Sequence, residues 1–109
     1  MLTWNINALE VAPHQPQVLD SEAEGRAIVI QLPAGDELRE HQVHERASLI
    51  VAAGEITIAD ADGESVDGGP GFLAVFEPKE RHKVTARTDA RLMLLLSPWP
   101  GEGHPSQGR

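Results

Sequence analysis

The chain has 109 residues, which gives room for one domain with one hydrophobic core. Its 9 Lys and Arg residues against 17 Asp and Glu give a net charge of −8, so nucleic acid and anionic membrane surfaces are poor partners. No apolar run approaches the roughly 18 residues of a membrane helix, and residues 1–5 do not resemble a signal peptide, so we expect a cytoplasmic protein. Since cysteine is absent, His, Asp and Glu are the plausible metal ligands.

The first third of the chain predicts two strands. Prolines on both sides of His14 disfavour regular structure there, and a short strand is expected at Val18-Leu19. Residues 26–32, RAIVIQL, alternate with a period of two, which predicts a half-buried strand. One face of that strand carries Ile28, Ile30 and Leu32.

The middle of the chain, residues 35–54, reads GDELREHQVHERASLIVAAG. It crosses a polar patch that holds two histidines, becomes the apolar run 49–51, and closes at a glycine. The alternating strand 56–59 follows and ends at the turn 60–63. Histidines on a strand that leads into a sheet core indicate a polar site inside a β-structure.

The rest of the chain predicts further strands. The turn-forming run DGGPG covers residues 67–71 and divides two of them. The expected strands are 64–66, 72–77, 82–87 and 91–97. The tail 98–109 is rich in Pro and Gly, so we expect it to be irregular.

These elements predict an all-β protein. No window of eleven residues keeps a 3.6-residue period, and short strands divided by Gly, Pro and Asp turns favour a closed or double-layered antiparallel fold. We therefore expect a single domain over residues 1–109, with a barrel core at about 18–97.

Two segments resemble the paired motifs of the cupin superfamily, the small jelly-roll β-barrels. In the first, Gly35 is followed by five residues and His41, and Gly54 closes the segment at the family's distance. In the second, Gly71 is followed by a five-residue strand, a turn and His82 at the family's spacing. The resemblance covers about residues 26–97 and implies a jelly-roll barrel, also described as a double-stranded β-helix.

The resemblance implies metal ligands at His41 and His82, but the family's other ligand positions are changed. Val43 occupies the place of the second histidine, and His44 is displaced from it by one residue. The family's carboxylate would fall on Ala47 or Ser48, and neither can bind a metal.

Alternation along a strand decides which nearby groups could replace the missing ligands. His44 should face outward unless a β-bulge at Gln42 or Val43 turns it inward, in which case it becomes the third ligand. Glu45 shares the inward face with His41 in a regular strand and is the alternative carboxylate.

The resulting hypothesis is a cupin barrel whose pocket binds a small molecule, together with a divalent metal (zinc, manganese, nickel or iron) at the histidines. Val43, Phe76 and Trp99 are the expected ligand contacts. Covalent catalysis is disfavoured because the chain has no Cys and few Ser, and whether it is an enzyme stays open. Two alternatives also stay open: a metal-free binding or sensing barrel, and a structural homodimer. In each case we expect a homodimer, as in other small cupins.

Overall fold

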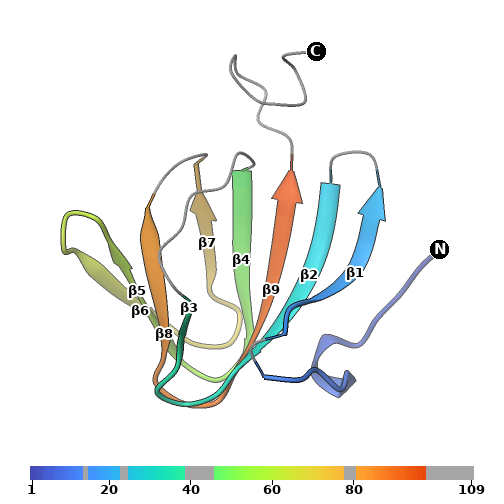
Figure 1. Cartoon of the computed structure of the whole chain (residues 1–109), viewed down its shortest axis with the longest axis horizontal. Helices are drawn as coiled ribbons and strands as arrows, with labels where there is room; N and C mark the ends of the chain where they lie inside the picture. Colours follow the sequence, from blue (N-terminus) through green and yellow to red (C-terminus); the bar gives the residue numbers. More distant parts are fainter. Residues whose placement is uncertain (14, 23–24, 39–45, 78–80, 98–109) are drawn as a thin grey trace, which may run out of the picture.

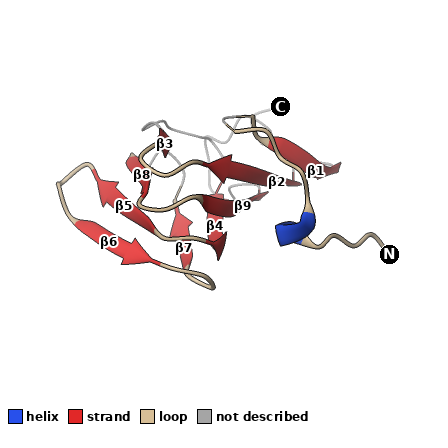
Figure 2. Cartoon of the chain, turned by 90° about the horizontal axis from the view of Figure 1, so that it is seen from below, coloured by secondary structure: helices blue, strands red, loops and turns tan. Residues whose placement is uncertain are grey.

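The chain folds into two antiparallel β-sheets packed face to face (Figures 1 and 2). The structure is a computed structural model that describes residues 1–13, 15–22, 25–38, 46–77 and 81–97. The five-stranded sheet has the order β1 (Gln17–Glu22), β2 (Gly25–Leu32), β9 (Ala90–Ser97), β4 (Arg46–Ala53) and β7 (Leu73–Phe76). The four-stranded sheet has the order β3 (Glu37–Leu38), β8 (His82–Ala86), β5 (Ile56–Asp60) and β6 (Ser65–Gly68). The predicted double-layered antiparallel β-structure is confirmed.

The core lies between the two sheets and is made by every second residue of their strands. In β2 these are Ile28, Ile30 and Leu32, as the alternation predicted. Across the core, the second sheet contributes Ile56 and Val84, which are 0% and 1% exposed. Burial of these branched side chains on both inner faces is what holds the sheets together.

The outer face of β2 is more buried than a half-buried strand implies, and the N-terminal segment is tied to the same sheet. Val29 points away from the core and is 0% exposed. Nearby, the Arg91 guanidinium of β9 donates to the carbonyls of Ile6 and Leu9, at 2.9 and 2.7 Å. These residues belong to or follow the short 3₁₀ turn η1 (Ile6–Ala8), which lies beside the five-stranded sheet in Figure 2.

The turn between β4 and β5 requires glycine. Gly54 has a φ of +82°, and a Cβ built on it would collide with the carbonyl oxygen of Asp89 and lie 2.7 Å from Cα of Ala90. The glycine that closes the first sequence motif therefore lets two turns pack backbone against backbone.

β6 continues further than the sequence indicated. Asp67 and Gly68, expected within a turn, pair with Thr57 and Ile56 of β5. The Thr57 hydroxyl donates to Asp67 Oδ1 at 2.7 Å, and Gly68 is buried against the ring of Phe72, where a Cβ would collide. Here tertiary packing overrides the weak strand propensity of Asp and Gly.

Among the residues that the structure describes, no helix is long and apolar enough to cross a membrane.

Candidate functional site

Two aromatic rings join the sheets at one end of the barrel. Phe76 is the last residue of β7 and His82 is the first of β8, so the two come from different sheets. Their rings are stacked with centroids 3.7 Å apart and planes within 2° of each other. Phe76 is 5% exposed and His82 is half-buried. In the second sequence motif, the histidine therefore stacks on the last residue of the strand that precedes it, β7.

On its inner side the stacked pair borders a small, partly enclosed space of about 30 Å³ among core residues. His82 is the one polar side chain among the described residues around it. The others are Leu38, Ala47, Leu49, Phe76, Val84, Leu94 and Leu96. This space could hold about one water molecule, but it offers a single side-chain polar partner where a buried water needs several.

On its outer side the pair borders a larger cavity of about 230 Å³, which opens between β7 and the β5–β6 hairpin. Its described lining combines an apolar wall with polar groups: Ile58, Val66, Ala74 and Phe76, with Asp60, Glu64, Ser65 and His82. Since Phe76 and His82 line both spaces, the stacked pair lies between them.

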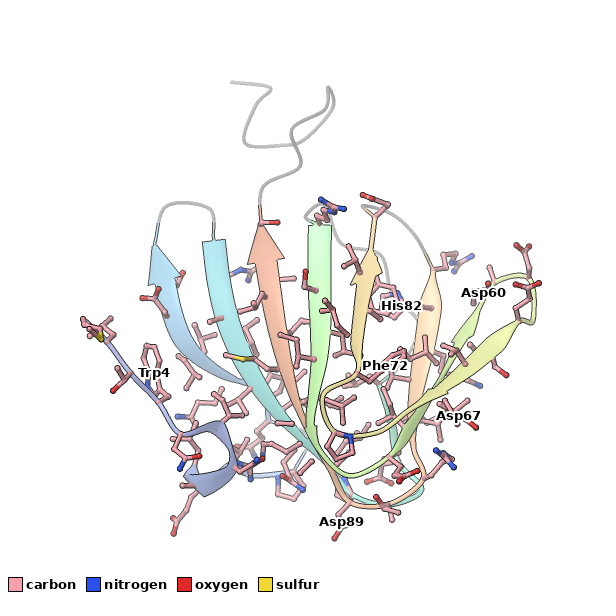
Figure 3. The ribbon with its side chains drawn as sticks, turned by 180° about the vertical axis from the view of Figure 1, so that it is seen from behind. Trp4, Asp60, Asp67, Phe72, His82 and Asp89 are labelled. Atoms are coloured by element: carbon pink, nitrogen blue, oxygen red, sulfur yellow. The ribbon has the colours of Figure 1, made fainter. Side chains whose placement is uncertain are left out.

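The register of the four-stranded sheet places a carboxylate directly across from the histidine. Asp60 of β5 pairs with His82 of β8, and both are labelled in Figure 3. This pair lies two residues beyond the pair of Ile58 with Val84 in the core. Asp60 Oδ1 accepts the backbone N–H groups of Asp62 and Glu64 at 2.9 and 3.0 Å, which fixes the hairpin turn. An imidazole, a positioned carboxylate and an apolar wall therefore meet in one cavity.

The structure describes two of the seven residues predicted for the site. His82 and Phe76 both line the cavity. The remaining five lie outside the described residues, and their predicted roles stay predictions. These are His41, Val43, His44, Glu45 and Trp99.

The place of the family's carboxylate is occupied by apolar packing. Ala47 is 3% exposed and lies in the core opposite Phe76, while Ser48 falls on the other face of β4. The described residues alone do not fit a divalent metal: beside His82 the inner space is lined by carbon, and they contain no group of three His, Asp or Glu side chains that could hold an ion.

Sequence reasoning did not single out Asp60 and Glu64, because Asp60 was read as the first residue of a turn and Glu64 as the first residue of the strand 64–66. The signal for Asp60 was present: Ile56, Ile58 and Asp60 follow a period of two, so the carboxylate continues the inward face of β5. For Glu64 no such signal exists, since its position depends on how the hairpin bends over the cavity.

Solved structures with similar folds are distant in sequence. The cupin domain of Cnp3 from Schizosaccharomyces pombe aligns with a TM-score of 0.79 at 14% identity, covering 90% of this chain and 74% of that one. A cupin superfamily protein from Desulfitobacterium hafniense aligns with a TM-score of 0.76 at 12% identity, covering 86% and 87%. An RmlC-like cupin from Desulfovibrio desulfuricans aligns with a TM-score of 0.75 at 18% identity, covering 89% and 98%. At these identities the likeness concerns the fold alone.

One curated relative is closer in sequence. L-ectoine synthase of Nocardia farcinica is 34% identical over 68 residues, which are 62% of this chain. The chain spans about half of that relative, 52% of its length. The model of the cupin domain family matches residues 28–98, well over half of the chain. The predicted double-stranded β-helix is thereby confirmed, and the chain belongs to the cupin domain family.

Proposed function

We propose that this cupin barrel binds a small organic molecule in the cavity beside the Phe76–His82 stack. The observation that carries the proposal is the cavity itself, about 230 Å³ with an apolar wall and a few convergent polar groups. Ligand sites in proteins commonly have this composition, and drug-sized ligands use larger pockets, so the expected ligand is small.

In this proposal the residues divide the work. Ile58, Ala74 and Phe76 contribute apolar contact with the carbon skeleton of the ligand, and the stack keeps the imidazole of His82 in one orientation. A neutral imidazole both donates and accepts a hydrogen bond, so His82 can orient a polar group or move a proton to or from it.

A binding screen by protein NMR tests the proposal. Small alcohols, amines and carboxylic acids are added to the labelled protein, and we expect at least one class to shift the amide signals of β7, β8 and the β5–β6 hairpin. A ligand of this kind should lose affinity in His82→Ala. If no compound shifts these signals, or if all shifts lie elsewhere, the pocket is not a ligand site.

The match to L-ectoine synthase supports a more specific candidate, in which this chain makes or binds L-ectoine. Titration with L-ectoine, followed on the same signals, tests binding, and an assay for L-ectoine formation tests catalysis. Saturable shifts that His82→Ala weakens would favour this candidate. Shifts that are absent or not saturable would remove L-ectoine and leave other small molecules open.

A divalent metal is the second candidate. His82 stands where the resemblance places a metal ligand, and the other predicted ligands, His41, His44 and Glu45, lie in the part of the chain that the structure does not describe. Metal binding to the folded form would stabilise it by about 2.7 kcal/mol at a hundredfold excess over the dissociation constant. A melt of the metal-stripped protein with zinc, manganese, nickel or ferrous iron should then show a shift that both His41→Ala and His82→Ala abolish. An unchanged melting temperature with all four ions would exclude the metal.

A further inference from the structure

We infer that the cavity beside His82 selects a small organic cation, whose charged nitrogen is held by Asp60 and Glu64 while its carbon chain lies on the apolar wall. This inference rests on the proposed function, because it names the class of ligand that the same cavity would take. Neither carboxylate belongs to the motifs that relate the chain to the cupins.

The charged side chains that line the cavity are acidic. Two carboxylates and one imidazole line it, and no Lys or Arg does among the residues that the structure describes. Two cations on the strands around the cavity have carboxylate partners of their own: Lys83 pairs with Glu37 at 3.7 Å, and Arg46 pairs with Glu77 at 3.5 Å. With a net charge of −8 on the whole chain, the potential in this concave site favours cations over anions.

The carboxylates have capacity left for a ligand. The two backbone hydrogen bonds to Asp60 both end on Oδ1, at 2.9 and 3.0 Å, and no described residue donates to its Oδ2. The carboxylate of Glu64 likewise has no partner among the described side chains. An ammonium group carries three N–H donors and can bridge two such acceptors.

The hairpin also holds one of these carboxylates in place before any ligand arrives. Because Oδ1 of Asp60 is fixed by the turn, Oδ2 loses little conformational freedom when a cation binds. Glu64 lies four residues further along the same turn, and its own backbone N–H makes one of those two bonds. The charged end of the ligand is therefore expected at the tip of the hairpin.

The apolar wall explains why the ligand is an organic cation and not a bare metal ion. Val66 is 48% exposed although it is a large aliphatic side chain on the cavity wall, and Ile58 and Phe76 continue the apolar surface inward. A hydrocarbon chain that covers Val66 would remove this exposed surface from water. A metal ion would bring its hydration shell against the same carbon atoms.

The test uses three probes with one carbon chain and three charges: n-butylammonium, n-butanol and n-butyrate. Each is titrated at constant ionic strength into the full-length protein, and binding is followed by NMR on the amides of β7, β8 and the β5–β6 hairpin. We expect n-butylammonium to bind more tightly than n-butanol and n-butyrate to bind most weakly. Added salt should weaken the binding of the ammonium more than that of the alcohol.

Two variants and one matched control test whether Asp60 and Glu64 bind the ammonium group. Asp60→Asn keeps an oxygen that can accept the turn hydrogen bonds, and Glu64→Gln changes no backbone contact. Each variant should weaken the binding of n-butylammonium about threefold to tenfold and leave the affinity for n-butanol unchanged. Asp62→Asn removes the same charge from the same hairpin, at an exposed residue that does not line the cavity, and should have little effect. Unchanged amide signals of β2 and β9 confirm that each variant is folded.

The outcomes separate the two claims. If the alcohol or the butyrate binds at these signals as tightly as the ammonium, or if neither Asp60→Asn nor Glu64→Gln weakens the ammonium more than Asp62→Asn does, the cation preference is wrong and the binding pocket stands. If none of the three probes shifts the signals around His82, both the pocket and its preference are overturned.

Discussion

Two cavities of similar size in this barrel differ in how their polar groups are used. One, of about 230 Å³, lies beside His82, and the other, of about 270 Å³, lies beside Arg91 under the N-terminal segment. By volume alone they could not be told apart.

In the cavity beside Arg91, the polar side chains already have structural partners. Arg91 Nε donates to Gln31 Oε1 at 2.7 Å and Nη1 donates to two backbone carbonyls. Asp89 Oδ1 accepts the N–H of Ala34 at 2.8 Å, and Asn7 Nδ2 donates to the carbonyl of Ala52 at 3.3 Å. These bonds tie η1 to the five-stranded sheet and join the turn at Ala34 to the turn at Asp89, so this cluster is structural.

In the cavity beside His82, by contrast, Oδ2 of Asp60 and the carboxylate of Glu64 have no donor among the described residues, and only Oδ1 of Asp60 is used by the turn. Polar groups without structural partners next to an apolar wall are what a ligand site provides. The comparison teaches that the bonding state of the polar groups, and not the volume, distinguishes the two cavities. It also predicts that substitution of Arg91 will lower stability without changing ligand affinity, whereas substitution of His82 will mainly lower ligand affinity.

The largest effect on stability is expected for Gly54→Ala, at the Arg91 end of the barrel. A side chain at a φ of +82° costs about 1 to 2 kcal/mol, and the collision with Asp89 must also be relieved by moving backbone. We expect a loss of about 3 to 4 kcal/mol in urea unfolding. Gly63→Ala is the control, since Gly63 has a φ of +87° and an added Cβ would meet nothing within 4 Å. This variant should lose only the stability that the unfavourable φ costs. Equal losses of unfolding free energy in the two variants would show that the close approach of the two turns does not contribute to the effect of Gly54→Ala.

Arg91→Ala should be next. It removes the three hydrogen bonds that the guanidinium makes to Gln31, Ile6 and Leu9, and we expect about 2 kcal/mol of destabilisation. Affinity for any ligand beside His82 should stay unchanged. Arg87→Ala is the matched control, because Arg87 pairs with Glu55 in an exposed bridge worth less than about 1 kcal/mol. A loss of ligand affinity in Arg91→Ala would break the distinction between the two cavities.

His82→Ala should show the opposite profile. The half-buried ring stacks on Phe76, so its loss should cost about 1 kcal/mol in stability. Ligand affinity should fall about tenfold, because the polar group that borders the apolar wall is lost. Both quantities can be read from one set of melts with and without the ligand found in the NMR screen. A variant that loses stability but keeps its affinity would make His82 a core residue.

The smallest effect on the stability of the monomer is expected for a substitution on the outer face of the five-stranded sheet. Leu73 and Val75 of the edge strand β7 and Leu95 of β9 are 55%, 42% and 38% exposed, and the register aligns Val75 and Leu95 through Ser48. We expect this apolar face to join two copies, with a mass by light scattering of about twice 11.8 kDa.

Val75→Lys should then give the mass of one chain while changing the unfolding free energy of the monomer by no more than about 0.5 kcal/mol. Leu2→Lys, which places the same charge on an exposed leucine outside the sheet, should remain a dimer. A mass of one chain in the unsubstituted protein would exclude the homodimer.

The sequence by itself determined the all-β class and most strand positions, because these follow from local periodicity and turn chemistry. The alternation in residues 26–32 identified the core face of β2, and the spacing from Gly71 singled out His82, which lines the cavity of the proposed site. Local pattern also indicated that Gly54 ends a strand.

Only the tertiary structure decided the rest, since it depends on contacts between residues distant in sequence. The placement of the N-terminal segment depends on hydrogen bonds from Arg91, near the other end of the chain, to the carbonyls of Ile6 and Leu9. The pairing of Asp60 with His82 depends on the register of two strands separated by β6 and β7. Strand alternation fixes which way a side chain points, but the strand register and the bend of a hairpin decide what it meets there.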